Sequence, residues 1–278
     1  MSIQLEILSL TRLICGVCSI VYALEKLLYK KPTHDLLSWE VLQLRHPIFI
    51  KIPIFNQLCA EKGIKIVTIV FLIGSIISIV TDIELLLILC YFMMSMCLLI
   101  FSARSAYGMD GSDQVIFIIA TCLFFIYLHN TVIIRHIAFT FITLQLLFSY
   151  FISGYAKLTA KVWRNGEALV GIMGNDIYGN ENVYTLLSQN IKISQVLSWV
   201  VFGWEALFFI CIFCNQHVFI CFIIVGFLFH LTNAIVMGLN TFFLAFVACY
   251  FPLIHCYLLV HSDAVFSFQV LGYQVFIV

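Results

Sequence analysis

Charged residues are scarce in this chain. It has 278 residues, and its 14 basic and 14 acidic residues make only 28 charged positions with no net charge. About a quarter of the residues of a soluble domain are charged, so the composition excludes an ordinary soluble protein. A balanced charge also gives no electrostatic reason to bind nucleic acid, and we expect no such partner.

The chain also has little that would build a disulfide-stapled or glycosylated secreted domain. It contains four prolines and no Asn-x-Ser/Thr site, and its eleven cysteines are an odd number placed mostly inside apolar runs. An odd count in such positions does not make a disulfide framework. We expect most of the cysteines to be small core residues.

Apolar residues, in contrast, make up 63% of the chain. They supply about eight membrane-spanning helices at ~20 apolar residues each. The runs are continuous rather than alternating, which favours helices over a membrane β-barrel. The sequence therefore predicts one all-α polytopic membrane domain over residues 1–278, with a retained first helix. The predicted helices cover residues 7–28, 64–80, 85–101, 114–128, 132–156, 191–214, 217–238 and 241–260.

Two polar stretches interrupt these runs. We expect residues 30–63 to lie at the membrane interface as short amphipathic pieces, and residues 158–190 to form a polar loop rich in Gly and Asn. With eight helices, twelve of the fourteen Lys and Arg residues fall on one side, and only Arg12 and Arg135 on the other. The positive-inside rule makes the crowded side cytoplasmic and places both termini outside.

Three ionisable residues stand out in the apolar runs: Lys157, Glu205 and His230. A charge in the hydrocarbon costs ~2.5 to 3.5 kcal/mol even on lenient insertion scales, so each requires a partner or a purpose. Within the 132–156 run and just beyond it, Gln145, Ser149, Ser153 and Lys157 recur every four residues. At 100° per residue they keep to a sector of about 120°, which indicates a face turned to protein or water.

This polar stripe ends on Lys157, and a lysine held in a polar pocket can act as a general base or a nucleophile. Two plainer interpretations stand beside it. Lys157 is placed where a lysine at a helix end snorkels to the interface. Glu205 and His230 are each suited to a structural hydrogen bond between helices.

Other motifs are weaker. The pairs Cys15/Cys18 and Cys211/Cys214 have the spacing of a thiol redox pair, although helix packing is the favoured interpretation. Residues 110–113, Asp-Gly-Ser-Asp, form an acidic turn without the spacing of a calcium loop. Residues 171–182 lack the Lys-Ser/Thr ending of a phosphate loop. We expect no metal site.

A longer motif lies across the end of the fifth predicted helix. It reads Tyr-Phe-Ile-Ser-Gly-Tyr-Ala-Lys-Leu over residues 150–158 and Trp-Arg-Asn-Gly-Glu-Ala-Leu over residues 163–169. This motif resembles the HTTM family, the membrane domain shared with vitamin K-dependent gamma-carboxylase. That family has Tyr-Phe-x-(Ser/Ala)-Gly-x-x-Lys-Leu, a short spacer and Trp-x-x-Gly-x-Ala. The match fixes about nine positions.

Further stretches are similar to the same family, so the resemblance covers residues 100–255. The turn at residues 110–114 resembles its Asp-Gly-Gly-Asp turn, and Gln145 and Glu205 fall where it has a glutamine and a later glutamate. Residues 229–233, Phe-His-Leu-Thr-Asn, resemble its His-x-x-Asn segment. The resemblance implies that Lys157 is the base linked to deprotonation of a reduced quinone or naphthoquinone, with His230 and Glu205 as neighbours. The cofactor would contact Gln145, Ser149, Ser153 and Trp163.

The chain departs from the carboxylase at two points. Ser112-Asp113 stands where the carboxylase has Asn-His, and no large soluble domain follows the last predicted helix. These departures argue against gamma-carboxylation itself. The short length and the acidic turn resemble a bacterial branch, the sporulation-delaying protein B-like family, which takes part in making a secreted antimicrobial peptide.

The sequence thus favours a bacterial membrane protein that modifies or matures a peptide, with carboxylase- or epoxidase-like chemistry. Its expected partners are membrane lipid, a secreted peptide and a second membrane protein. One alternative is a non-catalytic component of such a system, namely an immunity protein, a carrier or a scaffold. Another is a quinone-linked redox protein of the DoxX type that uses the paired cysteines.

Overall fold

Within the part of the chain that the structure describes, eight helices are long and apolar enough to cross a membrane, as the sequence predicts. The computed structural model describes residues 3–28, 39–45, 52–105, 109–261, 266–270 and 273–277. The eight candidate membrane spans are α1 (Ile3–Leu28), α5 (Glu61–Val80), α6 (Glu84–Arg104), α7 (Gly111–His129), α8 (Val132–Thr159), α12 (Ile191–Leu207) with the 3-10 helix η3 (Phe208–Phe213), α13 (Gln216–Met237) and α14 (Asn240–Val260). The all-α polytopic bundle is therefore confirmed, and the chain is an integral membrane protein in contact with lipid.

The predicted helix ends are correct to within a few residues because breaker or capping residues mark them. Pro53 begins the short helix before α5. Thr131 accepts a hydrogen bond from the Ile134 nitrogen at the start of α8, and Asn215 does the same for Val218 in α13. Gly238, with a φ of 73°, ends α13 in the left-handed conformation that glycine adopts without strain.

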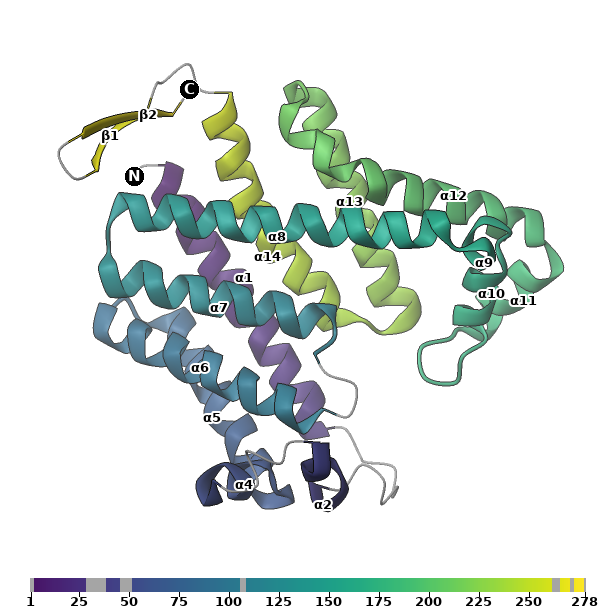
Figure 1. Ribbon diagram of the computed structural model, residues 1–278. Coiled ribbons are helices and arrows are strands. Elements are labelled where there is room, and N and C mark those ends of the chain that lie inside the picture. Colours follow the sequence, from purple (N-terminus) through teal and green to yellow (C-terminus); the bar gives the residue numbers. More distant parts are fainter. Residues whose placement is uncertain are drawn as a thin grey trace.

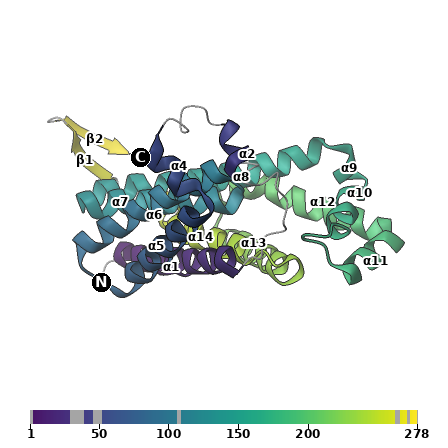
Figure 2. The same ribbon diagram turned by 90° about the horizontal axis from the view of Figure 1, so that it is seen from below.

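The centre of the bundle is built from α1, α7, α8 and α14, with α5 and α6 packed outside α1 and α7 (Figure 1). The core consists of large apolar side chains that include Phe71, Tyr91 and Phe139, all fully buried. On the other side of the bundle, α12 packs along α8, and α13 packs on α14. In the view turned by 90°, α1, α13 and α14 form the lower layer of the picture, and α6, α7 and α8 form the upper layer (Figure 2).

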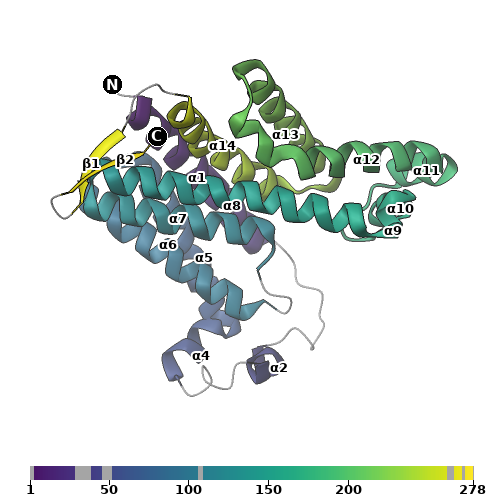
Figure 3. The ribbon, with the colours of Figure 1, turned by 45° about the horizontal axis from the view of Figure 1, so that its top comes forward.

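Helix α8 is longer than the membrane requires. Its 28 residues span about 42 Å, whereas a hydrocarbon core is about 30 Å thick. It reaches beyond the central bundle, and α12 lies side by side with its far half (Figure 3). An even number of spans returns the chain to the side on which it starts. The start of α1 and the end of α14 accordingly lie at the same end of the molecule (Figure 1).

The two polar stretches lie at the other end. Of residues 30–63, the structure describes α2 (Trp39–Leu42), the 3-10 helix η2 (Gln43–Arg45) and α4 (Pro53–Cys59); residues 29–38 and 46–51 lie outside the described residues. Trp39 and Cys59 belong to one buried cluster that joins α2 to α4. The Trp39 indole nitrogen also donates a hydrogen bond to the Asn56 side chain. These short helices are the described part of the stretch that the sequence predicts to lie at the membrane interface.

The stretch at residues 158–190 is more ordered than the predicted loop. It folds into three short helices, α9 (Lys161–Arg164), α10 (Glu167–Met173) and α11 (Glu181–Gln189). Asn180 caps α11 by accepting a hydrogen bond from the Val183 nitrogen. The many Gly and Asn residues in this stretch mark the joints between helices.

A short hairpin follows the bundle, which the sequence analysis does not predict. Strand β1 (Phe266–Val270) pairs antiparallel with β2 (Tyr273–Ile277), with Phe266 opposite Ile277 and Val270 opposite Tyr273. Apolar and polar residues alternate in Phe-Ser-Phe-Gln-Val, which is the period of a strand and was the available signal.

Candidate functional site

The centre of the candidate site is an ion pair between α8 and α12. The Lys157 Nζ atom lies 2.6 Å from both carboxylate oxygens of Glu205 and donates a further hydrogen bond of 3.0 Å to Ser153 Oγ. The Ser153 hydroxyl also lies 3.4 Å from both Glu205 oxygens. Glu205 is only 3% exposed. Three of the residues that the sequence singled out therefore meet in one place.

The direction of the Lys157 side chain argues against snorkelling. Its ammonium group bends back to Ser153, which is four residues earlier in α8, rather than forward past the helix end at Thr159. Its partner Glu205 lies in the interior of the span at Ile191–Phe213. The lysine thus turns into the bundle and not toward the interface.

A glycine makes the contact between the two helices possible. A Cβ atom added at Gly154 would lie 2.8 Å from Ala206 Cα and even closer to the Ala206 nitrogen. Real side chains do not tolerate such distances, so only glycine lets the backbones of α8 and α12 approach here. Lys157 follows about one turn later on the same helix, and the close approach places it beside Glu205.

The second half of the motif holds an aromatic ring over the lysine. Lys157 Nζ lies 5.2 Å from the centre of the Trp163 ring, within the range of a cation–π contact. Helix α9 carries Trp163, and the turn after α9 is fixed to α12. Ser194 Oγ donates to the Gly166 carbonyl at 2.6 Å, and the Gln195 and Trp199 side chains donate to the Arg164 carbonyl.

Gly166 has a structural requirement of its own. Its φ of 85° lies in the left-handed region, and a Cβ atom there would approach the Gln195 nitrogen to 2.6 Å. The Trp-x-x-Gly spacing therefore lets the chain reverse tightly after Trp163 and dock on α12.

His230 does not join the ion pair. It is 1% exposed, and its Nε2 atom lies 2.6 Å from the hydroxyl of Tyr150, which in turn lies 2.8 Å from the hydroxyl of Tyr250. Tyr150 stands on α8 about two turns before Lys157. The ion pair and the His230 cluster are thus neighbouring sites joined through α8, not the single cluster that the sequence suggests.

The far half of the polar stripe does not reach the ion pair. Ser149 is exposed, and its hydroxyl donates to the Gln145 carbonyl at 2.8 Å. A spacing of four residues drifts by 40° at each step, so Gln145 has turned about 120° away from Lys157. Of the predicted cofactor contacts, Ser153 and Trp163 lie at the ion pair, while Gln145 and Ser149 lie apart from it.

Sequence reasoning missed Tyr150, Tyr250, Trp204 and Gly226. The Trp204 ring packs 5.0 Å from Tyr150, and an added Cβ atom at Gly226 would clash with the Tyr250 hydroxyl and with Trp204. Tyrosine and tryptophan are common in membrane helices, so their type alone carries no signal. Tyr150 belongs to the motif, which was the only available hint.

A second polar cluster joins the cytoplasm-facing ends of α1, α7 and α14 in the predicted topology. The Tyr22 hydroxyl donates to Asp113 at 3.1 Å, and Lys26 lies 4.6 Å from the Tyr22 ring centre. Glu25 accepts hydrogen bonds from Thr241 at 2.7 Å and from Asn240 at 3.3 Å. Asp113 of the acidic turn thus ties α7 to α1, and Glu25 ties α1 to α14.

The paired cysteines are free thiols. Cys15, Cys18 and Cys211 are buried, and Cys214 is partly exposed. Cys18 donates to the Thr241 carbonyl at 3.4 Å across the α1–α14 contact. These positions fit helix packing.

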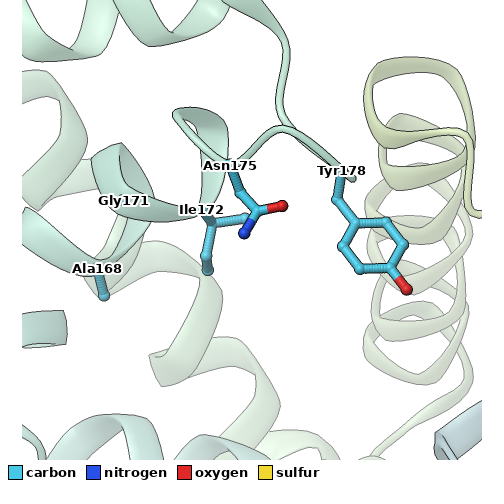
Figure 4. Close-up of a pocket in the computed structure, with 5 residues that line it drawn as sticks. All are labelled: Ala168, Gly171, Ile172, Asn175 and Tyr178. Carbon is cyan, nitrogen blue, oxygen red and sulfur yellow. The ribbon is translucent and has the colours of Figure 1, made fainter. Parts of the chain in front are cut away.

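A shallow pocket lies on α10 and the loop after it (Figure 4). Ala168, Gly171 and Ile172 of α10 line it together with Asn175 and Tyr178 of the following loop, and its volume is about 280 Å³. An added Cβ atom at Gly171 would meet no atom within 4 Å, so this surface is open.

The comparisons with known proteins give no assignment. No protein-family model, curated protein or solved structure matches the chain.

Proposed function

We propose that this protein acts in the modification or maturation of a peptide or protein, with Lys157 as a buried base. The observation that carries the proposal is the Lys157–Glu205–Ser153 cluster inside the helical bundle. The resemblance of its motif to the HTTM family supports the same assignment. Carboxylase- or epoxidase-like activity is the reaction class that follows from it.

The energetics of a buried ion pair favour a functional role. Replacing such a pair by well-packed apolar residues is often neutral or stabilising, so stability alone gives little reason for the two charges. Ionisable residues inside membrane helices mark a functional site by default. The ammonium lies 2.6 Å from the carboxylate, so a proton can pass from Lys157 Nζ to Glu205 and leave the neutral amine, which is the form that acts as a base.

A quinone-like lipid cofactor fits the surroundings of the pair. Trp163 offers an aromatic face beside Lys157, and Ser153 offers a hydroxyl. A bound reduced quinone or naphthoquinone would supply the redox chemistry that these side chains lack. In this proposal Ser153 and Trp163 bind and orient the ring, and the neutral amine of Lys157 accepts a proton from it.

The proposed setting is the bacterial cytoplasmic membrane, with both termini outside and with α9–α11 on the cytoplasmic side. A secreted peptide is the proposed substrate, and a second membrane protein is a proposed partner. Twelve of the fourteen basic residues lie on the cytoplasmic side of this arrangement, which supports it.

A non-catalytic role as an immunity protein, carrier or scaffold is the second candidate. The Gly154–Ala206 contact favours it, because an ion pair beside such a tight helix crossing is also suited to fixing α8 against α12. In that case the substitution of Lys157 would lower the amount of folded protein and leave the yield of peptide per folded protein unchanged.

The test compares Lys157→Met with the native chain in cells that lack the native gene. Secreted peptides are quantified by mass spectrometry, and folded protein is measured in the membrane fraction. The proposal expects that the Lys157→Met protein that does fold yields no mature peptide, and that the lipid extract of the purified native protein contains a quinone or naphthoquinone. An unchanged yield of mature peptide per folded Lys157→Met protein would refute the role of Lys157 as a base.

A further inference from the structure

Three buried side chains form a hydrogen-bonded row across α8, α13 and α14. The Tyr150 hydroxyl stands in the middle, 2.6 Å from His230 Nε2 and 2.8 Å from the Tyr250 hydroxyl. Gly226 permits this arrangement, because any side chain there would displace the Tyr250 hydroxyl. The row leaves one ring atom unused: His230 Nδ1 is buried and has no hydrogen-bond partner in the part of the chain that the structure describes.

Counting protons fixes the direction of the row for a neutral His230. In one direction Tyr250 donates to Tyr150, and Tyr150 donates to His230 Nε2. Every hydroxyl hydrogen then has an acceptor, and the remaining proton sits on Nδ1. In the opposite direction His230 Nε2 donates to Tyr150, which leaves one tyrosine hydrogen without an acceptor and Nδ1 without a donor. The first direction leaves fewer buried polar groups unsatisfied and is preferred.

A second unused donor lies nearby. The Trp204 Nε1 atom is buried and has no acceptor among the described residues. An indole nitrogen can only donate. The Trp204 ring is 5.0 Å from the Tyr150 ring and 5.8 Å from the ring of Phe229, which directly precedes His230. The same group of rings therefore contains two N–H donors that have no acceptor among the residues that the structure describes.

We infer that His230 Nδ1 and Trp204 Nε1 bind an acceptor oxygen of a lipid-soluble ligand, of the carbonyl type that a quinone carries. Tyr150 and Tyr250 act as positioning residues that keep the proton on Nδ1. This inference rests on the proposed function for the class of ligand, and it assigns that ligand's oxygen to residues outside the Lys157–Glu205 pair.

The surroundings of α13 favour a ligand that arrives through the lipid. The helix packs on α14 and η3, and much of its remaining surface is apolar and exposed, including Ile224, Leu228 and Ile235. An apolar molecule can therefore approach α13 from the lipid without crossing water. A buried N–H donor that gains an acceptor also recovers the cost of leaving it unpaired.

The first test determines the tautomer directly. Nitrogen-15 NMR of the purified native protein, labelled at histidine, should show a protonated Nδ1 and a bare Nε2 for His230, identified by its loss in His230→Gln. Tyr150→Phe removes the hydroxyl that donates to Nε2, so it should give a mixture of the two His230 tautomers. A protonated Nε2 in the native protein would overturn the inference.

The second test measures binding of ubiquinone-1 and of its reduced quinol by quenching of tryptophan fluorescence. Both forms carry an acceptor oxygen, so both should bind. His230→Gln keeps an amide near the position of Nε2 and removes the Nδ1 donor, so it should weaken quinone binding about tenfold. His230→Asn places an amide nitrogen near the position of Nδ1 and should weaken it less. No quinone binding, equal loss in both variants, or displacement by phosphatidylglycerol would contradict the assignment.

Lys157→Met separates this inference from the proposed function. The quinone should still bind to that variant, because its oxygen contacts lie at His230 and Trp204. If Lys157→Met still binds the quinone and still yields the mature peptide, the role of Lys157 as a base is refuted and the placement of the ligand stands. Lost binding in Lys157→Met, with normal folding, would refute the placement of the ligand.

Discussion

Lys157 and Glu205 form an ion pair of 2.6 Å between α8 and α12, although 48 residues separate them in the chain. The carboxylate is almost fully buried, and the lysine side chain is 18% exposed. The pair, the glycine contact beside it and the Trp163 ring above it account for most of the motif at residues 150–169.

The first prediction concerns the energy of the pair. Lys157→Met and Glu205→Leu should each destabilise the protein by about 3 kcal/mol, because each leaves one buried charge without its partner. The double variant should lie close to the native stability, since no unpaired charge remains. Reversible unfolding in mixed micelles gives the free energy of unfolding of the native protein, the two single variants and the double variant. A double variant that loses the sum of both single effects would show that the charges are not coupled.

The second concerns the crossing of α8 and α12. Gly154→Ala should cost about 1 to 3 kcal/mol, since its Cβ atom would press into the Ala206 backbone. Gly203→Ala on α12 is the matched control, because an added Cβ there meets nothing within 4 Å. Thermal unfolding in detergent should show a lower midpoint for the first variant and an equal or higher one for the second. Equal midpoints for both would contradict the close contact.

The third concerns the turn that carries Trp163. Gly166→Ala is strained by its φ of 85° and by the nearby Gln195 nitrogen, so it should detach α9 and α10 from α12. Limited proteolysis should then cut at residues 161–180 much faster than in the native protein. Gly171→Ala lies in open space on α10 and should leave the rate unchanged. Native-like protection in Gly166→Ala would refute the docking.

The predictable part of the structure is the part that the lipid dictates. Apolar runs fixed all eight spans, because a membrane helix must be apolar over about 20 residues. The sequence indicates only that Lys157 and Glu205 each require a partner or a purpose, because a lone charge is costly in these runs. The place of His230 was not predictable. It depends on how α13 and α14 pack, and Tyr150 and Tyr250 look like ordinary membrane residues in the sequence.

The fourth concerns the cysteines and the redox alternative. Burial raises the pKa of the Cys59 thiol to about 11, so at pH 8 little reactive thiolate is present. In detergent a maleimide at pH 8 should label the partly exposed Cys214 and spare Cys59, Cys15 and Cys18. Cys59 labelling should rise as the pH approaches 11. Rapid labelling of Cys15 or Cys18, or a disulfide between them, would favour the DoxX-type redox role instead.

The fifth prediction concerns the central claim that Lys157 is a base rather than a structural cation. Exchanging the two charges in Lys157→Glu/Glu205→Lys keeps an ion pair between α8 and α12 and moves the amine to the other helix. The most direct measurement is the yield of mature peptide per folded protein in this variant, by mass spectrometry. The loss of a positioned base costs about 10²- to 10⁴-fold, so we expect normal folded protein with product at or below about 1% of the native yield. Native yield from the charge-exchanged protein would contradict the account and leave the pair a structural role.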